Sequence, residues 1–422
     1  MMSLFISSHY KNSPNDLQLM SDAPAHLLFV LLGPLTPNED NKNQIPDILC
    51  VIQIALEGNI SENSIIKQRG VKPSGDLIPW TVGEQYQDNQ FPRLNGARVI
   101  RIASHPSAQK MGYGSKALEI LSKFFQGNLI NLDEGKNVID LLRTSGFKEN
   151  NDNSENLTEE NLKPRKKLQP ILKKLTELRP PLLHYLGVSY GLTKELFNFW
   201  RKNEFYPVYL RQSKNDLTAE HSCIMLKKLL DEPIEQEDSL NNEWLKGYYE
   251  DFKRRFLSLL AYEFKEIDIK LSLGVLEPNL TQNANEENDL AEEKDSIKKE
   301  ELNFWLNLYD LKRLEAYSKN MVDFHLIIDL LPSLARLFFS KKFTKSLKFS
   351  YSQAAILMGM GLQHKSVEQI AAEINLPVAQ VLALFNKAIR KITNHIKGIY
   401  EKEIEKNMNQ KKDIDVRKKS IF

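Results

Sequence analysis

The chain has 422 residues, 41% of them hydrophobic and 27% charged, which indicates a folded protein of roughly two to three domains rather than an intrinsically disordered one. Its two cysteines, Cys50 and Cys223, exclude a disulfide framework and a cysteine-rich zinc site, so we expect no metal and a reducing compartment. No apolar run approaches the roughly 20 residues that span a bilayer, so no membrane contact is expected. The formal net charge is only +2, so the distribution of charge along the chain is more informative than its total.

The first third of the chain mixes strands and helices. Short runs with strand-like patterns predict three strands, at 26–32, 48–56 and 98–103. Residues 114–125 then predict a helix, because Leu118, Leu121 and Phe125 recur on one face. The pattern dissolves over 128–180, where a stretch rich in Asn, Asp and Glu predicts a disordered insertion.

Regular patterns return after this insertion. They predict a strand, a helix, two further strands and a long amphipathic helix, at 185–190, 193–202, 206–210, 222–226 and 243–264. Thr193 is expected to cap the helix that it begins. With the earlier elements these form an α+β domain over 1–275, and the Asn-, Glu- and Lys-rich residues 276–300 are interpreted as a linker or loop.

The last part of the chain shows helical periodicity only. Its clearest stripe consists of apolar residues three and four positions apart, Val378, Leu382, Phe385, Ile389, Ile392, Ile396 and Ile399. We therefore expect an all-α C-terminal domain over 301–406. The polar and basic residues 407–422 are expected to form a frayed or disordered tail.

One segment carries a recognisable chemistry: the strand ending at Ala103 leads through the turn Gln-Lys-Met-Gly-Tyr-Gly-Ser at 109–115 into a helix. A turn of this kind exposes consecutive backbone N–H groups at a helix N-terminus, where the helix dipole also favours anions. Gly112 and Gly114 suit it, because a Cβ would block close approach of the backbone or resist a positive φ. The segment therefore predicts a pyrophosphate cradle.

The strand, glycine turn and helix resemble the acetyl-CoA motif of the GNAT superfamily, a strand followed by Gln/Arg-x-x-Gly-x-Gly/Ala and a helix. Further stretches are similar to the RNA cytidine acetyltransferase family and together cover nearly the whole chain. They are SHYKNSPNDL at 8–17, MSDAP at 20–24, SGDLIPW at 74–80, LGVSYGL at 186–192, PVYLRQ at 207–212, EHSCIML at 220–226, DLKRLE at 310–315, NMVD at 320–323 and GLQHKSV at 361–367.

This resemblance implies a GNAT acyltransferase domain, with a mixed central sheet flanked by helices, that transfers acetyl from acetyl-CoA to N4 of cytidine in RNA. The chain is most similar to the eukaryotic branch, whose members modify small-subunit rRNA and, with a tRNA-binding adaptor protein, certain tRNAs; the implied location is the nucleus and nucleolus. Family members also carry a helicase-like ATPase module before this domain. The chain contains no Gly-x-x-x-x-Gly-Lys-Ser/Thr loop, so ATPase chemistry would come from a separate or missing module, on which activity could depend.

The resemblance also assigns residues to acetyl-CoA. The cofactor is expected to bind the end of the strand, the turn, and a basic position after Phe199-Trp200, which gives Ile102, Ala103, Ser104, Gln109, Lys110, Met111, Gly112, Tyr113, Gly114, Ser115, Arg201 and Lys202. At position 202 relatives have arginine, and lysine keeps the charge but lacks the planar fork of donors.

His9 and Arg101 match active-site positions of the family. His9 is the best candidate for moving a proton near neutral pH, the alternative being a hydrogen-bonded structural histidine. Arg101 could bind phosphate or orient the RNA. His105 and His221 are expected to shape a turn and a strand end instead.

The helical part contains a stretch of one charge: residues 331–365 hold six Lys or Arg residues, the last of them Lys365, and no Asp or Glu. A run of this kind can be a solvated face, but basic residues that gather on one domain also suit RNA phosphates. The expected RNA contacts are Arg336, Lys341, Lys342, Lys345, Lys348, Lys387, Arg390 and Lys391.

Two other functions remain open. The cradle alone does not distinguish a cytidine base from a protein lysine or a small amine as the acetyl acceptor. Residues 366–392 resemble a helix-turn-helix around Leu376-Pro377 that could bind DNA, although helix pairs of this kind are also common packing units.

Overall fold

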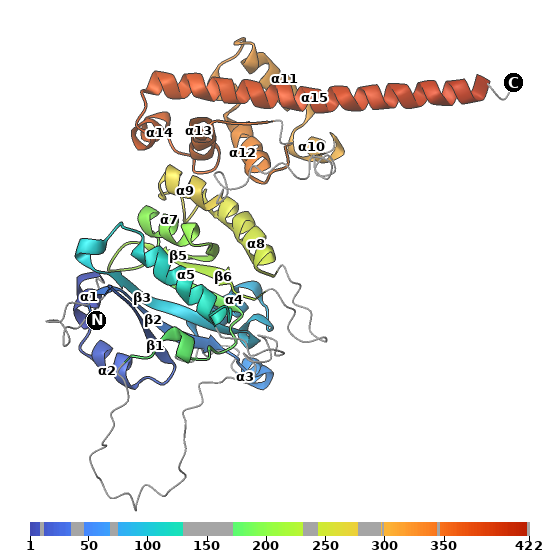
Figure 1. Ribbon diagram of the computed structural model, residues 1–422. Helices are drawn as coiled ribbons and strands as arrows, with labels where there is room; N and C mark the ends of the chain where they lie inside the picture. Colours follow the sequence, from blue (N-terminus) through green and yellow to red (C-terminus); the bar gives the residue numbers. More distant parts are fainter. Residues whose placement is uncertain are drawn as a thin grey trace, which may run out of the picture. The chain divides into compact units, whose positions relative to one another are not determined.

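The structure is a computed structural model of the chain. It describes residues 1–8, 12–34, 46–67, 75–129, 172–230, 244–276, 297, 299–343 and 347–419, with side chains up to residue 405. The chain divides into two compact units, Met1–Tyr249 and Glu250–Phe422 (Figure 1). This division lies earlier than the linker expected at 276–300, because helix α9 (Ile269–Leu276) packs against α13 (Tyr351–Gly361) and α14 (Val367–Ile374) of the second unit.

A six-stranded sheet forms the centre of the first unit. Its strand order is β1-β2-β3-β4-β6-β5. The strands are β1 (His26–Leu32), β2 (Ile48–Gly58), β3 (Asn95–Ser104), β4 (Tyr185–Gly191), β5 (Tyr206–Lys214) and β6 (His221–Lys228). Neighbouring strands are antiparallel except β3 and β4, which run parallel. Every strand that the sequence predicts is present, and the α+β class is confirmed.

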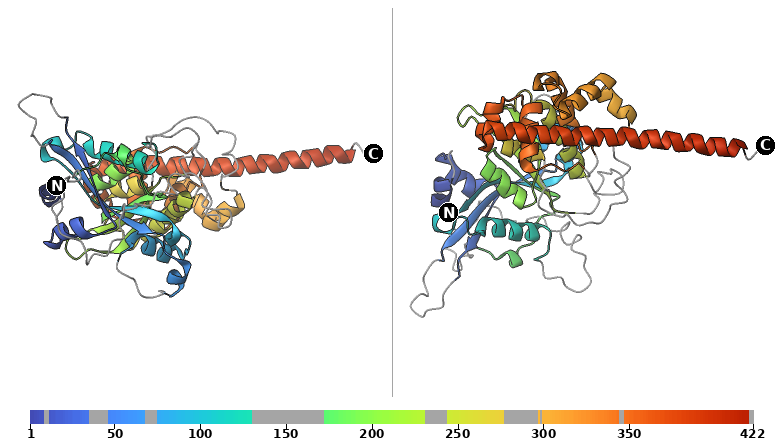
Figure 2. Two further views of the ribbon diagram at one scale, coloured as in Figure 1. Left: turned by 60° about the horizontal axis from the view of Figure 1, so that its bottom comes forward. Right: turned by 90° about the horizontal axis from the view of Figure 1, so that it is seen from above.

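Helices cover both faces of this sheet, as Figures 1 and 2 show. They are α1 (Met2–Ser8), α2 (Asn15–Asp22), α3 (Glu62–Lys67), α4 (Leu77–Tyr86), α5 (Tyr113–Phe125) and α7 (Lys194–Lys202), with the short 3-10 turns η2 (Phe91–Arg93), η3 (Pro106–Ala108) and η4 (Leu175–Glu177). Side chains alternate along β1. Leu28 and Val30 pack with Phe5 of α1, whereas Phe29 meets the rings of Phe124 and Phe125 of α5 with centroids 5.9 and 6.0 Å apart. The helices α1 and α5 therefore lie on opposite faces of the sheet.

The second unit is helical. It contains α9, α10 (Lys299–Trp305), α11 (Leu308–Ser318), η6 (Phe324–Leu326), η7 (Ile328–Leu330), α12 (Leu331–Phe339), α13 (Tyr351–Gly361), α14 (Val367–Ile374) and α15 (Val378–Lys419), and α8 (Trp244–Leu259) spans the division between the units. The helix α13 is buried along most of its length. Gly361 allows its close approach to α12, because a Cβ there would lie 2.8 Å from the carbonyl oxygen of Leu331.

The long helix α15 supplies the main apolar stripe of the second unit, and Figure 2 shows it as one continuous rod. Phe385, Ile389, Ile392 and Ile396 are buried, as the sequence predicts. The first turn differs, because it buries Val381, whereas Val378 and Leu382 are 40% and 38% exposed.

Two predicted helix ends were wrong. The helix expected at 243–264 ends at Leu259, after which the chain turns so that the ring of Phe264 stacks on Phe256 at 5.5 Å. The tail expected to fray continues α15 to Lys419. Residues 407–419 contain neither Pro nor Gly, and extending an existing helix avoids the cost of nucleation.

Most of the insertion expected at 128–180 and the linker residues 277–296 lie outside the described residues. Within the described part of the chain, no helix is both long and apolar enough to cross a membrane. The same residues contain no cluster of three His, Cys, Asp or Glu side chains that could hold a metal ion.

Candidate active site

The segment between β3 and α5 is a tight series of turns. Strand β3 ends at Ser104, and the imidazole of His105 accepts the N–H of Ser107 at 3.3 Å, which shapes η3. The chain then passes through Lys110 with φ +61° and Gly112 with φ +90° before α5 begins. His105 is thus a turn-forming residue, as the sequence suggests.

The backbone of this segment is rich in free donors. Among the described residues, no acceptor is found for the N–H groups of residues 109–115, and the first amide of the helical ladder is that of Lys116, which donates to Gly112 at 3.0 Å. The first three of the helical N–H groups point out of the N-terminus of α5, where the helix dipole adds positive potential. This arrangement is suited to an anion such as a pyrophosphate.

The two glycines of the turn have different roles. Gly112 needs its left-handed backbone, and a Cβ there would meet nothing within 4 Å. Gly114 has no positive φ, and a Cβ built on it would touch the Phe199 ring and the Ser104 Oγ atom at 3.5 Å, an ordinary contact. The protein's own atoms would therefore tolerate a Cβ at position 114. The absence of a side chain there instead leaves space for a bound ligand to approach the backbone.

Strand β3 parts from β4 beside this turn. Their parallel pairing runs from Gly96 to Val99 of β3 and stops, although both strands continue. On its other edge β3 stays paired with β2 up to Ser104, with one irregularity: the register moves from Gln53↔Arg101 to Ile54↔Val99. Ile100 is the extra residue of a bulge. Within the described part of the chain, the edge of β3 over 100–104 that faces β4 therefore has no strand partner.

The bulge also decides which way Arg101 points. Gln53 and Ala55 share one face of β2, and their partners on β3 are Arg101 and Arg98. Both arginines therefore lie on the face that α1 covers. In a regular strand, residues on one face are two positions apart; here the bulge adds one residue, so the two arginines are three positions apart.

On this face Arg101 is held firmly. Its guanidinium donates to the Asp16 carboxylate of α2 at 2.7 Å and lies 5.9 Å from the centre of the Phe5 ring, and both side chains of the ion pair are largely buried. The backbone N–H of Ser13 also donates to Asp16, at 2.8 Å. These two bonds, the Ser13 amide first and then Arg101, lower the pKa of Asp16. Nothing in the sequence alone pairs Asp16 with Arg101; the pair forms because α2 packs on the sheet.

Replacing Arg101 with methionine is expected to lower the free energy of unfolding by about 2 kcal/mol, because Asp16 loses a charged hydrogen-bond partner in a place largely shielded from water. The double variant Arg101→Met with Asp16→Asn should recover most of that loss. Urea unfolding of the single and double variants measures both effects. Recovery of stability in the double variant would show that the lost contact with Asp16 causes the destabilisation; no recovery would contradict this explanation.

The remaining candidate residues fall into three groups. His9 lies outside the described residues. Arg201 and Lys202 end helix α7, with Arg201 half-buried and Lys202 exposed. The imidazole of His221 is buried and lies 2.9 Å from the Arg211 carbonyl oxygen, so it is structural, as expected.

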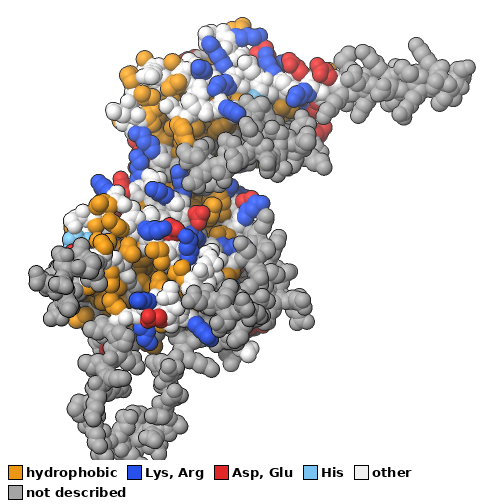
Figure 3. All heavy atoms as spheres, in the orientation of Figure 1, with side chains coloured by type: hydrophobic (Ala, Val, Ile, Leu, Met, Phe, Trp, Pro, Cys, Tyr) orange, Lys and Arg blue, Asp and Glu red, His pale blue; other side chains and the backbone are white. Residues whose placement is uncertain are grey.

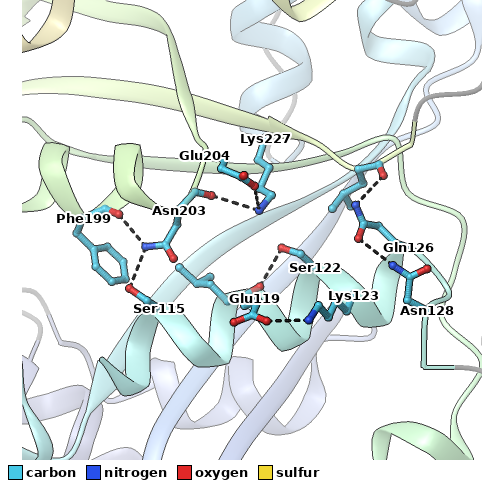
Figure 4. Close-up of polar contacts among 12 residues, drawn as sticks. Ser115, Glu119, Ser122, Lys123, Gln126, Asn128, Phe199, Asn203, Glu204 and Lys227 are labelled. Carbon is cyan, nitrogen blue, oxygen red and sulfur yellow. Dashed lines mark hydrogen bonds and ion pairs between the residues drawn. The ribbon is translucent and has the colours of Figure 1, made fainter. Parts of the chain in front are cut away.

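Sequence reasoning missed two polar groups near these residues. The side chain of Gln53 is 3% exposed and lies 3.2 Å from the imidazole of His26 on the neighbouring strand. Desolvation, and then the charge of Arg98, lower the pKa of His26. The other is Asn203 at the end of α7, whose side chain contacts Ser115 of the cradle (Figure 4). Neither has a local motif, because each depends on strand register or helix docking.

A cavity of about 600 Å³ lies elsewhere in the first unit. Leu31, Ile52 and Leu121 are among the residues that line it, beside β1 and the body of α5. None of residues 109–115 lines it. The lining is mostly apolar, although it also includes Lys173 and Lys174, and the cavity is separate from the turn at 109–115.

In the helical unit, several of the basic residues predicted to bind RNA already have protein partners. Lys342 pairs with Glu301 at 3.0 Å, Arg390 donates to Asn320 at 2.9 Å, and Lys391 donates to the Lys348 carbonyl at 2.8 Å. The side chains of Arg336, Lys341, Lys348 and Lys387 are exposed, and Lys345 lies outside the described residues. Figure 3 shows Lys and Arg side chains spread over the visible face of this unit. The candidates thus differ in whether their side chains already bind other protein groups or are exposed and available to bind a phosphate.

Lys365, the last member of the basic run, is structural. It is 9% exposed, and its ammonium donates to Glu373 at 2.7 Å and to the Ile267 carbonyl at 3.0 Å. The helix pair α14 and α15 forms as the sequence suggests, with Ser366 as N-cap and Asn375 in the left-handed region. Because α15 then continues as the apolar spine of the unit, nothing in the pair favours DNA binding over packing.

Two family models match the chain. One, described as GNAT acetyltransferase 2, matches residues 1–230, and the other, described as a possible tRNA binding domain, matches residues 244–421. Among curated relatives, the RNA cytidine acetyltransferase of Dictyostelium discoideum is 47% identical over 420 residues, that of Homo sapiens 48% over 417 residues, and that of Saccharomyces cerevisiae 45% over 424 residues. These alignments cover 97%, 98% and 98% of this chain but only 39%, 39% and 38% of the relatives.

Proposed function

Because this chain belongs to the GNAT acetyltransferase 2 family, we propose that it transfers an acetyl group from acetyl-CoA to N4 of a cytidine in RNA. The observation that carries the proposal is the run of N–H groups over 109–115, for which the described residues offer no acceptor, beside a strand that parts from its parallel neighbour after Val99. Relatives named RNA cytidine acetyltransferase support cytidine as the acceptor, and a helical unit matched by a tRNA-binding model supports RNA as the partner.

The residues present fit acetyl-CoA. The N–H groups of 109–115 and the Ser115 hydroxyl would hold its phosphates, Lys202 would add positive charge at the end of α7, and the free edge of β3 would meet the part of the cofactor nearer the acetyl group. When bound, acetyl-CoA supplies an acetyl group activated as a thioester. The absence of a Cβ at Gly114 leaves room for a ligand to approach the backbone.

The chain's own groups then have separate tasks. Backbone N–H donors on the free edge of β3 over 100–103 would stabilise the negative charge that develops on the acetyl oxygen. The lone pair of N4 is delocalised into the cytosine ring, so orientation and removal of a proton carry much of the rate enhancement. We assign proton removal to His9 and orientation of the RNA to Arg101, which β3 presents on the face opposite α5.

The acceptor has to be a cytidine outside its base pair. In a duplex N4 takes part in pairing, so the enzyme would take a flipped or unpaired base. We propose small-subunit rRNA, tRNA or both as substrates, a tRNA-binding adaptor and a helicase-like ATPase module as partners, and a nuclear and nucleolar location. These follow from the resemblance to the eukaryotic branch.

One experiment separates this function from its nearest rival, acetylation of a protein lysine or small amine. The protein is incubated with acetyl-CoA and either small-subunit rRNA or tRNA, and the digested RNA is examined by mass spectrometry. N4-acetylcytidine is the expected product. Acetyl-lysine on added protein, with unmodified RNA, would transfer the assignment to the rival. The same incubation with a helicase-like ATPase module and ATP added shows whether the chain needs that module.

RNA binding by the helical unit is expected to depend on salt through its lysines. Each phosphate contact releases condensed counterions, so affinity should fall steeply as salt rises. The fourfold change of Lys341, Lys342, Lys345 and Lys348 to alanine should weaken binding and flatten the slope of log affinity against log salt by up to about 3. Lys342 should contribute least, because Glu301 already partly neutralises it.

The measurement is RNA affinity over a salt series for the parent and the variant. The matched control changes the same four lysines to arginine, which keeps the charge. Acetyl-CoA affinity should be the same in all three proteins, because the four residues lie outside the GNAT unit. Equal slopes for parent and alanine variant would show that these lysines form a solvated face.

A further inference from the structure

A side-chain amide links two helices at the start of the cradle. The Asn203 Nδ2 atom donates to the Phe199 carbonyl at 2.7 Å and to the Ser115 Oγ atom at 3.2 Å (Figure 4). Asn203 is the C-cap of α7, and Ser115 lies in the first turn of α5. The amide therefore connects the end of one helix to the anion-binding end of the other.

The bond to Phe199 fixes the orientation of this amide. A carbonyl oxygen can only accept, so the amide atom 2.7 Å from it has to be the nitrogen. The same nitrogen faces Ser115, and therefore the serine oxygen accepts. Its own proton is then free to be donated elsewhere, because a hydroxyl is both acceptor and donor.

The serine has no competing acceptor in the described part of the chain. A helical serine often turns its proton back to a carbonyl of the preceding turn, and no such bond is found for Ser115. The neighbouring N–H groups of 109–115 also lack acceptors among the residues that the structure describes, so the hydroxyl and the amides form one set of available donors.

The backbone of Asn203 is fixed as well. The Lys227 ammonium of β6 donates to the Asn203 carbonyl at 3.3 Å and pairs with the Glu204 carboxylate at 2.9 Å. The Asn203 amide N–H donates to the Trp200 carbonyl at 3.1 Å, and Glu204 turns the chain with φ +66°. The contact to Ser115 is thus supported from α7 and from the sheet.

We infer that Asn203 is a positioning residue for the cofactor site: it occupies the acceptor side of the Ser115 hydroxyl and so directs the hydroxyl proton toward a phosphate oxygen of the bound acetyl-CoA. This inference rests on the proposed function. It assigns a role to a residue outside the glycine turn, and it makes Ser115 a preset donor rather than a freely rotating one.

Two variants at position 203 test this role: one removes the amide donor, and the other replaces it with a negatively charged acceptor. In Asn203→Ala the serine proton can rotate away, and acetyl-CoA affinity should fall about tenfold, which corresponds to about 1.4 kcal/mol. In Asn203→Asp the carboxylate accepts the serine proton and adds a negative charge near the phosphates, so the loss should be larger than in the alanine variant. Isothermal titration with acetyl-CoA measures both, with thermal unfolding as a check on folding.

The matched control is Gln126→Ala at the other end of α5. Its amide also ties this helix to the rest of the sheet unit by donating to the Leu229 carbonyl at 3.1 Å. Gln126 lies far along the helix from Ser115 (Figure 4). It should lose stability without losing acetyl-CoA affinity. A similar loss of affinity in this control would mean that any weakening of α5 docking is sufficient, and would overturn the inference.

A double-variant cycle decides whether Asn203 acts through Ser115. In a Ser115→Ala background, Asn203→Ala should have almost no further effect on acetyl-CoA affinity. Additive losses would contradict the inference, as would unchanged affinity in the two single variants at position 203. Failure of the parent protein to bind acetyl-CoA would instead contradict the proposed function, so the two failures are distinguishable.

Discussion

Changing Gly114 to glutamate is expected to lower acetyl-CoA affinity by at least about 100-fold while the protein stays folded. The fold should survive, because a Cβ at this position makes only ordinary contacts with Phe199 and Ser104. The carboxylate, in contrast, would stand among the N–H donors of 109–115 and take the place of the cofactor phosphates while repelling them. Isothermal titration with acetyl-CoA and circular dichroism measure the two effects.

Two further substitutions at position 114 separate size from charge. Glutamine has the bulk of glutamate without its charge, and alanine adds only the Cβ. The expected loss of affinity rises from Gly114→Ala through Gly114→Gln to Gly114→Glu. If the glutamate variant binds acetyl-CoA as the parent does, the phosphates are not held at this turn, and the cofactor assignment fails.

Changing His9 to alanine is expected to lower turnover by about 10² to 10⁴-fold with little change in acetyl-CoA affinity, since the proposed task of His9 is proton transfer. His9 lies outside the described residues, but the elements on either side of it are anchored on the same face of the sheet. Phe5 is buried against Val51 and Ala103, and Asp16 binds Arg101 of β3. Single-turnover acetylation of RNA at saturating acetyl-CoA measures the rate.

A second histidine on this face provides the comparison. His26 is half-buried beside Gln53, and its lowered pKa keeps it neutral near pH 7, so it could also accept a proton. His26→Gln should change turnover only a few-fold if His9 is the base. A large loss in His26→Gln, with near-parental turnover in His9→Ala, would reverse the assignment.

The sequence predicted the sheet well because its strands carry local signals. Runs such as residues 48–56 contain several β-branched residues, and the glycine turn before α5 has a backbone requirement that only glycine meets easily, with φ +90° at Gly112. Helix ends were predicted less well. The stop of α8 at Leu259 depends on a contact between Phe256 and Phe264, which no local pattern reports.

The candidate site shows the same division. The turn at 109–115 could be predicted because all its parts are consecutive in the chain. The pairing of Arg101 with Asp16 could not, because it depends on the bulge at Ile100 and on the docking of α2. Asn203 lies in an ordinary helix end, and only the packing of α7 beside α5 brings its amide to Ser115.

The parallel pairing of β3 with β4 also has a consequence for how the protein folds. The Asn95 amide donates to the His184 imidazole at 3.0 Å where this pairing begins, and the two residues are 89 positions apart. Closing so long a loop is entropically costly, and contacts of high sequence separation slow folding. The hairpin of β1 and β2 and the helix α5 can form early from nearby residues. The place where β3 parts from β4 after Val99, in contrast, exists only once this distant pairing has formed. The ability to bind cofactor should therefore appear late in folding, after most of the secondary structure is in place.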